Sequence, residues 1–67
     1  MMRVTVNGTE RTMDEGSTVA DLLEQLGMNR DGVAVAVGRS VVPRSQHDQR
    51  VLVDGAKIEV IRAVGGG

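Results

Sequence analysis

The chain ends in three glycines, Gly65, Gly66 and Gly67, whose type and position suggest chemistry. Because glycine has no Cβ, a glycine run can thread a narrow channel and approach another molecule closely. From Arg62 to Gly67 an extended chain reaches at most roughly 20 Å, at about 3.3–3.6 Å per residue. Such a tail can carry its carboxylate into a partner's active site. A carboxylate is a poor electrophile, so it would need activation, most simply by adenylation.

The alternative for these glycines is a frayed chain end, since termini are often disordered, or an expression scar. The other polar side chains offer less chemistry. His47 is the sole histidine and lies in the polar stretch SQHDQ, which predicts a surface loop, because a metal site needs several ligands. Ser40 and Ser45 would need a positioned base to act as nucleophiles. Asp14 and Glu15 precede the N-terminus of a predicted helix, where their negative charge interacts favourably with the helix dipole. We expect no catalytic side chain and no metal site.

The composition excludes several classes of function. The 67 residues include no cysteine and no aromatic residue, and the net charge is −1 with eight basic and nine acidic side chains. Without aromatic side chains or a basic patch, nucleic-acid binding is not expected. No apolar run is long enough for a membrane helix, and the N-terminus lacks a signal-peptide pattern. These features predict a single cytoplasmic domain over residues 1–67, with no nucleic-acid or membrane partner.

The first half of the sequence predicts a β-hairpin and a helix. Residues 2–6 alternate in polarity, Asn7-Gly8 suits a type I′ turn, and residues 9–13 return as the second strand. Thr18 is the expected helix N-cap, with Asp21 at the capping-box position, although Ser17 could cap instead. The apolar stripe of this helix follows i, i+3, i+4, i+7 spacing and comprises Val19, Leu22, Leu23 and Leu26, before Gly27 ends the helix.

The second half predicts three more strands. Residues 33–37, VAVAV, are apolar on both faces and indicate a buried strand. A short strand at Val41 and Val42 ends at Pro43, and the last strand covers KIEVIRAV. This order predicts an α+β fold, in which a mixed sheet of about five strands carries one main helix on one face. Residues 65–67 would form a flexible tail.

In this order the segments resemble the ThiS family, the sulfur carriers of bacterial thiazole synthesis. MRVTVNG resembles that family's opening hairpin, and GSTVADLLEQLG resembles its helix. VAVAVGRSVVPRSQ resembles the segment ending in a Val-Pro-Arg motif, here Val42-Pro43-Arg44. VLVDGAKIEVIRAVGGG resembles the last strand and the terminal diglycine, here Gly66 and Gly67. The resemblance implies a ubiquitin-like β-grasp fold.

The resemblance also implies a mechanism centred on Gly67. A ThiF-like adenylyltransferase would adenylate its carboxylate with ATP, a sulfur donor protein would convert it to a thiocarboxylate, and a thiazole synthase would accept the sulfur. The chain would be a carrier and a protein substrate, not an enzyme, with no cofactor of its own. The candidate partner contacts are Val42, Pro43, Arg44, Arg62 and Val64.

Three positions depart from the family pattern. Gly38 stands where Asn is usual, His47 where Trp is common, and Gly65 where a small residue such as Ala is common. The first two leave the choice of partner open. The alternatives are a sulfur carrier for molybdopterin or another pathway, a ubiquitin-like modifier joined to lysines through Gly67, and an interaction module with an idle tail. The short length and the Val-Pro-Arg motif favour the thiazole pathway.

Overall fold

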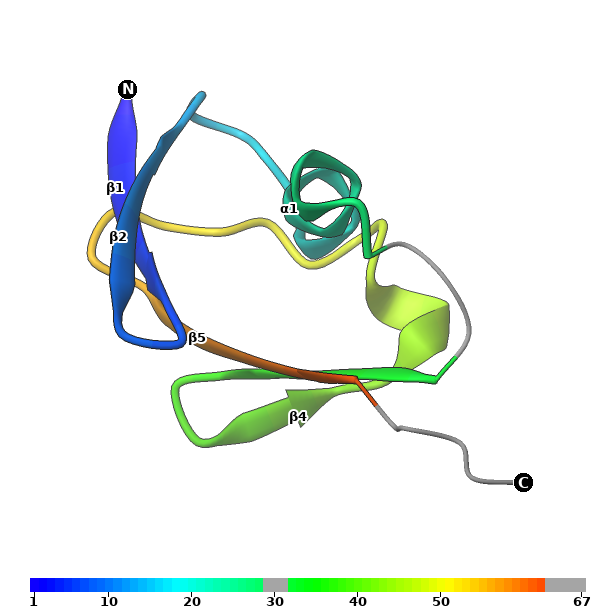
Figure 1. Ribbon diagram of the computed structural model, residues 1–67. Coiled ribbons are helices and arrows are strands. Elements are labelled where there is room, and N and C mark those ends of the chain that lie inside the picture. The colour runs from blue at the N-terminus through cyan, green and yellow to red at the C-terminus, as the bar shows by residue number, and fades with distance from the viewer. Residues whose placement is uncertain (29–31, 63–67) are drawn as a thin grey trace.

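The computed structural model describes residues 1–28 and 32–62, which form a five-stranded mixed sheet with one α-helix on one face (Figure 1). In chain order the elements are β1 (Met2–Val6), β2 (Thr9–Met13), α1 (Val19–Leu26), β3 (Val33–Val37), β4 (Ser40–Val42), the 3₁₀ turn η1 (Arg44–Gln46) and β5 (Lys57–Arg62). The strands lie in the order β2-β1-β5-β3-β4. β1 and β5 run parallel, and the other neighbours are antiparallel. This arrangement confirms the predicted α+β, ubiquitin-like fold.

The β1–β2 hairpin forms as the alternating pattern predicts. Asn7 and Gly8 have φ angles of 50° and 85°, so both turn residues lie in the left-handed region that a type I′ turn requires. Met2 pairs with Met13 at the open end of the hairpin, and both side chains are buried. The hairpin therefore presents its apolar face to the interior.

Helix α1 begins and ends at the predicted residues. The Asp21 amide donates to Thr18 Oγ1 at 3.2 Å, and the Thr18 amide donates to Asp21 Oδ2 at 2.9 Å, which completes a capping box. Gly27 closes the helix in the left-handed conformation with φ of 70°. Local sequence signals thus mark both ends of this helix, and the amides of Val19 and Ala20 in its first turn donate to the carbonyls of Arg50 and His47 in a distant loop.

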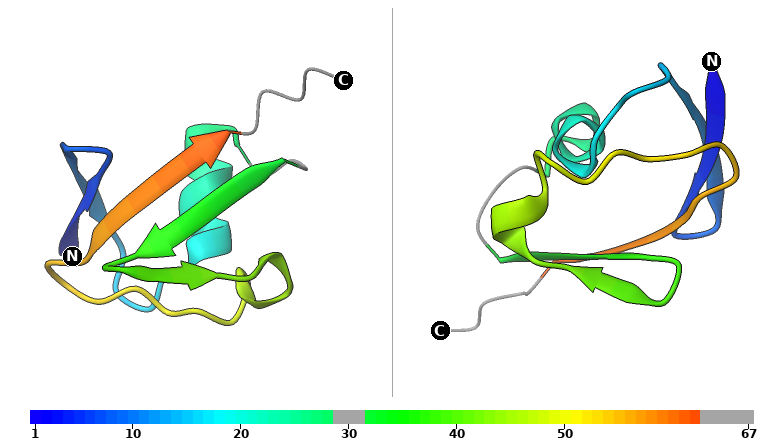
Figure 2. Two further views of the ribbon diagram at one scale, coloured as in Figure 1. Left: turned by 90° about the horizontal axis from the view of Figure 1, so that it is seen from below. Right: turned by 180° about the vertical axis from the view of Figure 1, so that it is seen from behind.

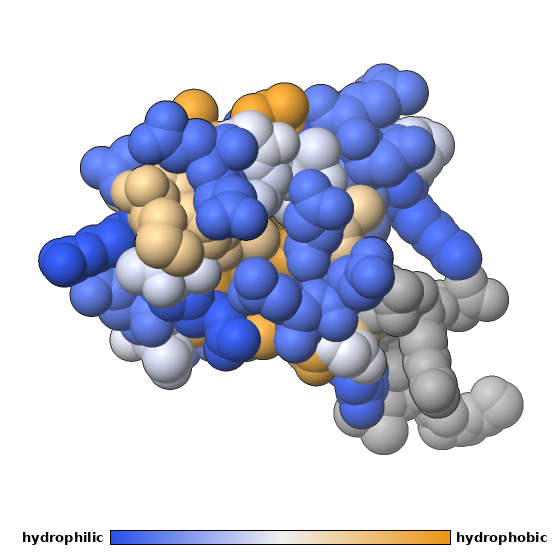
Figure 3. All heavy atoms as spheres, turned by 90° about the horizontal axis from the view of Figure 1, so that it is seen from above, coloured by the Kyte–Doolittle hydropathy of each residue, from blue (hydrophilic) through white to orange (hydrophobic). Residues whose placement is uncertain are grey.

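The core lies between α1 and one face of the sheet. The left view of Figure 2 shows α1 behind β3 and β5. The buried apolar side chains come from the helix, the strands and the segment before β5; they are Met2, Val4, Val6, Met13, Val19, Leu22, Leu23, Val35, Val42, Leu52, Ala56, Ile58 and Val60. Leu22 is fully buried, with 0% of its surface exposed. Seen from the α1 side, the surface is mostly hydrophilic (Figure 3).

The prediction that residues 33–37 are buried on both faces is wrong. Val35 is buried and its neighbours Val33 and Val37 pack against the core, whereas Ala34 is exposed and Ala36 is half-buried. The reason is that α1, the one α-helix of residues 1–28 and 32–62, covers only one face of the sheet (Figure 2). The apolar character of the other face therefore calls for a different explanation. In the described residues, no helix is long and apolar enough to cross a membrane.

Candidate functional site

The glycine tail continues from β5, so this strand is the part of the candidate site that the structure describes. Val64, Gly65, Gly66 and Gly67 lie outside the described residues, and their predicted roles remain predictions. Arg62 is exposed at the end of β5. It is the described residue from which the tail departs.

Strand β5 is positioned by neighbours on both sides. On one side it pairs in parallel with β1 over a short register, and on the other it pairs antiparallel with β3, from Val37 opposite Ile58 to Val33 opposite Arg62. Its side chains alternate between the two faces of the sheet. Ile58 and Val60 enter the core, whereas Glu59 and Ile61 lie on the face that α1 does not cover. β5 therefore connects the core to the tail and also contributes side chains to the uncovered face of the sheet.

That uncovered face carries an exposed apolar surface, which we call the open-face patch, formed by Ala34, Ala36, Val41 and Ile61. Val41 and Ile61 are 74% and 62% exposed. With Val35 and Glu59, these residues line a shallow hollow of about 80 Å³ across β3, β4 and β5. Large apolar side chains gathered on one surface are typical of protein interaction sites. The patch is continuous with the strand that leads to the tail.

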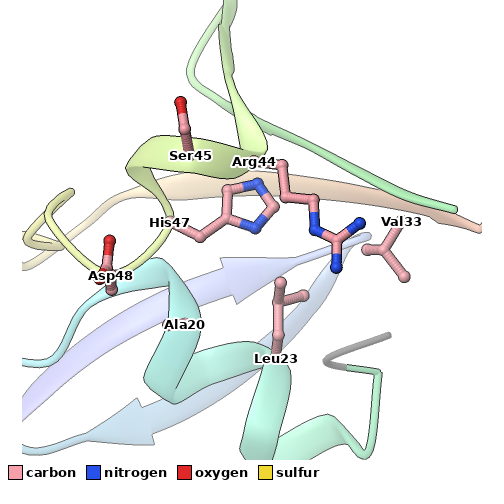
Figure 4. A pocket seen from close by; sticks show the side chains of 7 residues that line it. All are labelled: Ala20, Leu23, Val33, Arg44, Ser45, His47 and Asp48. Atoms are coloured by element: carbon pink, nitrogen blue, oxygen red, sulfur yellow. The ribbon is translucent and has the colours of Figure 1, made fainter. Parts of the chain in front are cut away.

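The predicted contact residues Val42, Pro43 and Arg44 differ in exposure. Val42 ends β4 with only 3% of its surface exposed, so its side chain belongs to the core and its position gives no support to a docking role. Pro43 and Arg44 are exposed. The Arg44 side chain extends into a hollow of about 330 Å³ between η1 and α1 (Figure 4).

His47 is buried, so the prediction that it lies in a surface loop is wrong. Only 9% of its surface is exposed, and its Nε2 lies 3.1 Å from the carbonyl oxygen of Val42. Its own carbonyl accepts from the Ala20 amide at 2.8 Å, which joins this loop to α1. His47 therefore has a structural role, because it connects this loop to the end of β4 and to α1.

Gly38, the other departure that left the choice of partner open, has a conformational explanation. Its φ is 65° in the turn between β3 and β4. Glycine and Asn are the residues that adopt such an angle most readily, so either suits the position. The geometry of the turn therefore accounts for Gly38.

The described residues offer no assembled catalytic group. Over residues 1–28 and 32–62, no three His, Asp or Glu side chains lie together as a metal site would require. Ser40 and Ser45 are exposed, and neither hydrogen-bonds to His47, whose Nε2 faces Val42. Glu15 pairs with the Met1 amino group at 3.7 Å on the surface. The described features of the candidate site are the exposed apolar open-face patch and the end of β5.

The family model of the ThiS family matches residues 4–67. The chain belongs to the ThiS family. It is 35% identical to sulfur carrier protein ThiS of Escherichia coli K12 over 98% of this chain and 100% of that protein. It resembles the crystal structure of thiamine biosynthesis protein ThiS of Geobacter metallireducens, with a TM-score of 0.81 and 33% identity over 98% and 100% of the two chains. Membership confirms the interpretation of the sequence as a sulfur carrier protein of thiazole biosynthesis.

A different class of relative is longer than this ThiS-family chain. A thiazole synthase of Paramagnetospirillum magneticum is 38% identical over 66 residues, and another of Magnetococcus marinus is 35% identical. The match covers 98% of this chain but only 20% of each thiazole synthase. The chain thus spans about one fifth of the length of these relatives.

Sequence reasoning missed the open-face patch. The sequence does contain a signal for this patch. VAVAV is apolar at every position, and Ile61 adds an apolar residue to the same side of the sheet. A buried strand and a strand with one docking face share this pattern. The prediction of a single helix, which covers one face, would have distinguished them.

Proposed function

We propose that this ThiS-family chain carries sulfur for thiazole biosynthesis on the carboxyl carbon of Gly67, as a protein substrate rather than as an enzyme. The observation that carries the proposal is that the family match runs through residue 67. It therefore includes the terminal diglycine together with the β-grasp body. A terminal carboxylate at the end of a side-chain-free segment suits delivery into an enclosed active site.

The chemistry requires activation followed by substitution. A ThiF-like adenylyltransferase joins the Gly67 carboxylate to the AMP portion of ATP and releases pyrophosphate. The terminal sulfur of a persulfide on a donor protein then attacks the acyl carbon of the adenylate, forms the C–S bond and displaces AMP, which leaves an acyl disulfide. A thiol then attacks the donor-side sulfur, breaks the S–S bond and remains with the donor as a disulfide, and the Gly67 thiocarboxylate is released. The product is a thiocarboxylate, whose sulfur a thiazole synthase accepts. ATP belongs to the partner's reaction, and the carrier holds no cofactor.

The open-face patch is the surface by which we propose that the carrier docks on the adenylyltransferase. Val41 and Ile61 are the largest exposed apolar side chains on this face. The patch and the tail share β5, so docking through the patch brings the tail to the same partner. Burial of apolar surface is the main favourable contribution to most associations between proteins.

The thiazole synthase relatives support the identity of the sulfur acceptor. In two of them a segment similar to this chain lies in one polypeptide with the remaining four-fifths of the protein. A covalent connection of this kind raises the effective concentration of one module at the other. We infer that the separate chain delivers its sulfur to the same kind of enzyme.

Deletion of Gly67 tests the proposal. It shortens an extended tail by about 3.3–3.6 Å, and a misplacement of about 1 Å already costs a reaction around a hundredfold. We expect ATP–pyrophosphate exchange by the adenylyltransferase of the same organism to fall at least about a hundredfold, whereas the melting temperature hardly changes. Adding one residue after Gly67 should have the same effect, and Gly66→Val should also fail because its branched Cβ restricts the backbone.

The control is Thr9→Ala, an exposed change in the hairpin that leaves the tail intact. Equal exchange rates for the parent, the truncated and the extended protein would reject the carrier mechanism. Intact-mass measurement on protein from its native cell separates the remaining alternatives. A thiocarboxylate replaces one oxygen with sulfur, whereas a protein modifier would carry an additional polypeptide.

A further inference from the structure

Asn7 makes two hydrogen bonds that the hairpin turn does not require. Its Nδ2 donates to the carbonyl oxygen of Val60 at 3.0 Å, and its Oδ1 accepts from the Val60 amide at 2.9 Å. Both bonds cross 53 residues of sequence to the last strand. The donor and the acceptor of the Asn7 side-chain amide are therefore both paired with the backbone of one β5 residue, Val60.

This side chain extends a short backbone ladder. The parallel pairing of β1 and β5 covers Thr5 with Lys57 and Val6 with Ile58, and the Asn7 amide donates to the Ile58 carbonyl at 2.9 Å. Beyond that point β1 turns away into the hairpin. The Asn7 carboxamide takes the place of the next peptide group and prolongs the pairing to Val60.

Without Asn7, the backbone of Val60 has no partner on this side. Along a strand, the amide and carbonyl groups of successive residues point to alternate sides. Those of Val60 face β1, so β3, on the other side of β5, cannot satisfy them. A partly buried peptide group left unpaired is costly. The Asn7 bonds therefore hold the end of β5 against the sheet on the side that β3 does not reach.

The held residue lies close to the reactive end. Val60 precedes Arg62, the last described residue, and its side chain is buried while the Ile61 side chain faces the open-face patch. A one-residue slip of a strand would exchange these two faces. The antiparallel pairing with β3 sets this register from Ile58 to Arg62, and the Asn7 bonds hold the same segment of β5 from the β1 side.

We propose that Asn7 is a positioning residue for the activation of Gly67, because its carboxamide fixes the end of β5 from which the tail departs. The inference rests on the proposed function as a sulfur carrier. Three of the four patch residues, Ala34, Ala36 and Val41, lie on β3 and β4, and the fourth, Ile61, is held in register by its pairing with Ala34 of β3 rather than by Asn7. Loss of the Asn7 side chain should therefore affect the reaction of the docked complex more than docking itself.

Two variants separate this role from the turn. Asn7→Gly and Asn7→Asp both keep a residue that tolerates the positive φ before Gly8, since Gly-Gly and Asp-Gly form the same turn. Asn7→Gly removes both side-chain bonds. Asn7→Asp retains an acceptor for the Val60 amide but places a carboxylate oxygen against the Val60 carbonyl. Thr9→Ala, beside the turn and exposed, is the matched control.

The first measurement is amide hydrogen exchange at a temperature where every variant is folded. In Asn7→Gly we expect exchange at Val60 to accelerate at least about tenfold relative to exchange at Ile61, whose backbone faces β3. The second is steady-state adenylation by the ThiF-like enzyme of the same organism. We expect kcat to fall at least about tenfold for both variants, with KM within about twofold of the parent value, since small displacements of reacting groups are costly.

The outcomes distinguish this inference from the proposed function. If the parent protein is not adenylated, both are rejected. If the parent is adenylated and Asn7→Gly matches it in kcat while Val60 exchanges faster, the positioning role alone is rejected. A rise in KM with unchanged kcat would make Asn7 a docking residue, and an equal loss in Thr9→Ala would make the effect nonspecific. Unchanged exchange at Val60 would show that the two hydrogen bonds do not hold β5.

Discussion

Replacing Ile61 with Thr tests whether the open-face patch docks on the adenylyltransferase. Thr keeps the branched Cβ that favours a strand but removes most of the apolar surface that a partner could cover. Burying a whole Ile side chain contributes about 1.5–3 kcal/mol. Because 62% of the Ile61 surface is exposed in the free protein, a partner can bury at most that share, which corresponds to about 0.9–1.9 kcal/mol.

This free energy sets the expected size of the effect. At about 1.4 kcal/mol per factor of ten, Ile61→Thr should weaken binding by at most roughly 5- to 20-fold. The matched control is Val53→Thr, because Val53 is 66% exposed and lies outside the patch, in the segment before β5. Both changes lie on the surface, so the free energy of unfolding of each should change by no more than about 0.5 kcal/mol.

The assay is titration of the carrier into the adenylyltransferase, with calorimetry for Kd and pyrophosphate exchange for KM. We expect Kd and KM to rise for Ile61→Thr and to stay unchanged for Val53→Thr. Equal affinity of Ile61→Thr and the parent would remove the patch from the docking surface. Weakening by Val53→Thr instead would place the docking surface near the segment before β5.

The remaining predictions concern the interior. Leu22→Ala should lower the free energy of unfolding by about 2–5 kcal/mol, because Leu22 is fully buried. A domain of this length has only about 3–10 kcal/mol of stability in total. The midpoint of urea unfolding should therefore fall much further for Leu22→Ala than for Leu26→Ala, which changes a half-buried residue. His47→Ala should cost about 1–3 kcal/mol by removing the partner of the Val42 carbonyl. A calorimetric melting curve measures this cost, and slower adenylation of the still folded His47 variant would instead indicate a partner contact.

The elements that could be predicted from the sequence are those whose signals are local. The Thr18–Asp21 capping box, the Gly27 C-cap and the Asn7-Gly8 turn each depend on residues a few positions apart, and each forms as predicted. The apolar stripe of α1 and the alternating polarity of β1 then determine which face of the helix packs against which face of the sheet. Family resemblance adds the order of the strands in the sheet, which local patterns leave open.

The features that could not be predicted depend on distant partners. His47 lies in a polar stretch without periodicity, and its burial follows from contacts with Val42 and with α1 that only the folded chain creates. Asn7 has the sequence signal of a turn residue, while its second role depends on Val60, 53 residues away. The open-face patch was hidden for another reason, since an apolar strand has the same composition whether a helix or a partner covers it.

The sharing of β5 by the patch and the tail limits where a partner can perform the activation. Ile61 lies in the proposed docking surface, and Gly67 follows it by six positions of sequence. An extended chain over this interval spans at most about 20–22 Å. In the proposed complex the adenylating enzyme would therefore hold its nucleotide within that distance of its contact with Ile61. The core fixes β5 through Ile58 and Val60, and docking fixes Ile61, so the length of the tail determines whether the carboxylate reaches the nucleotide.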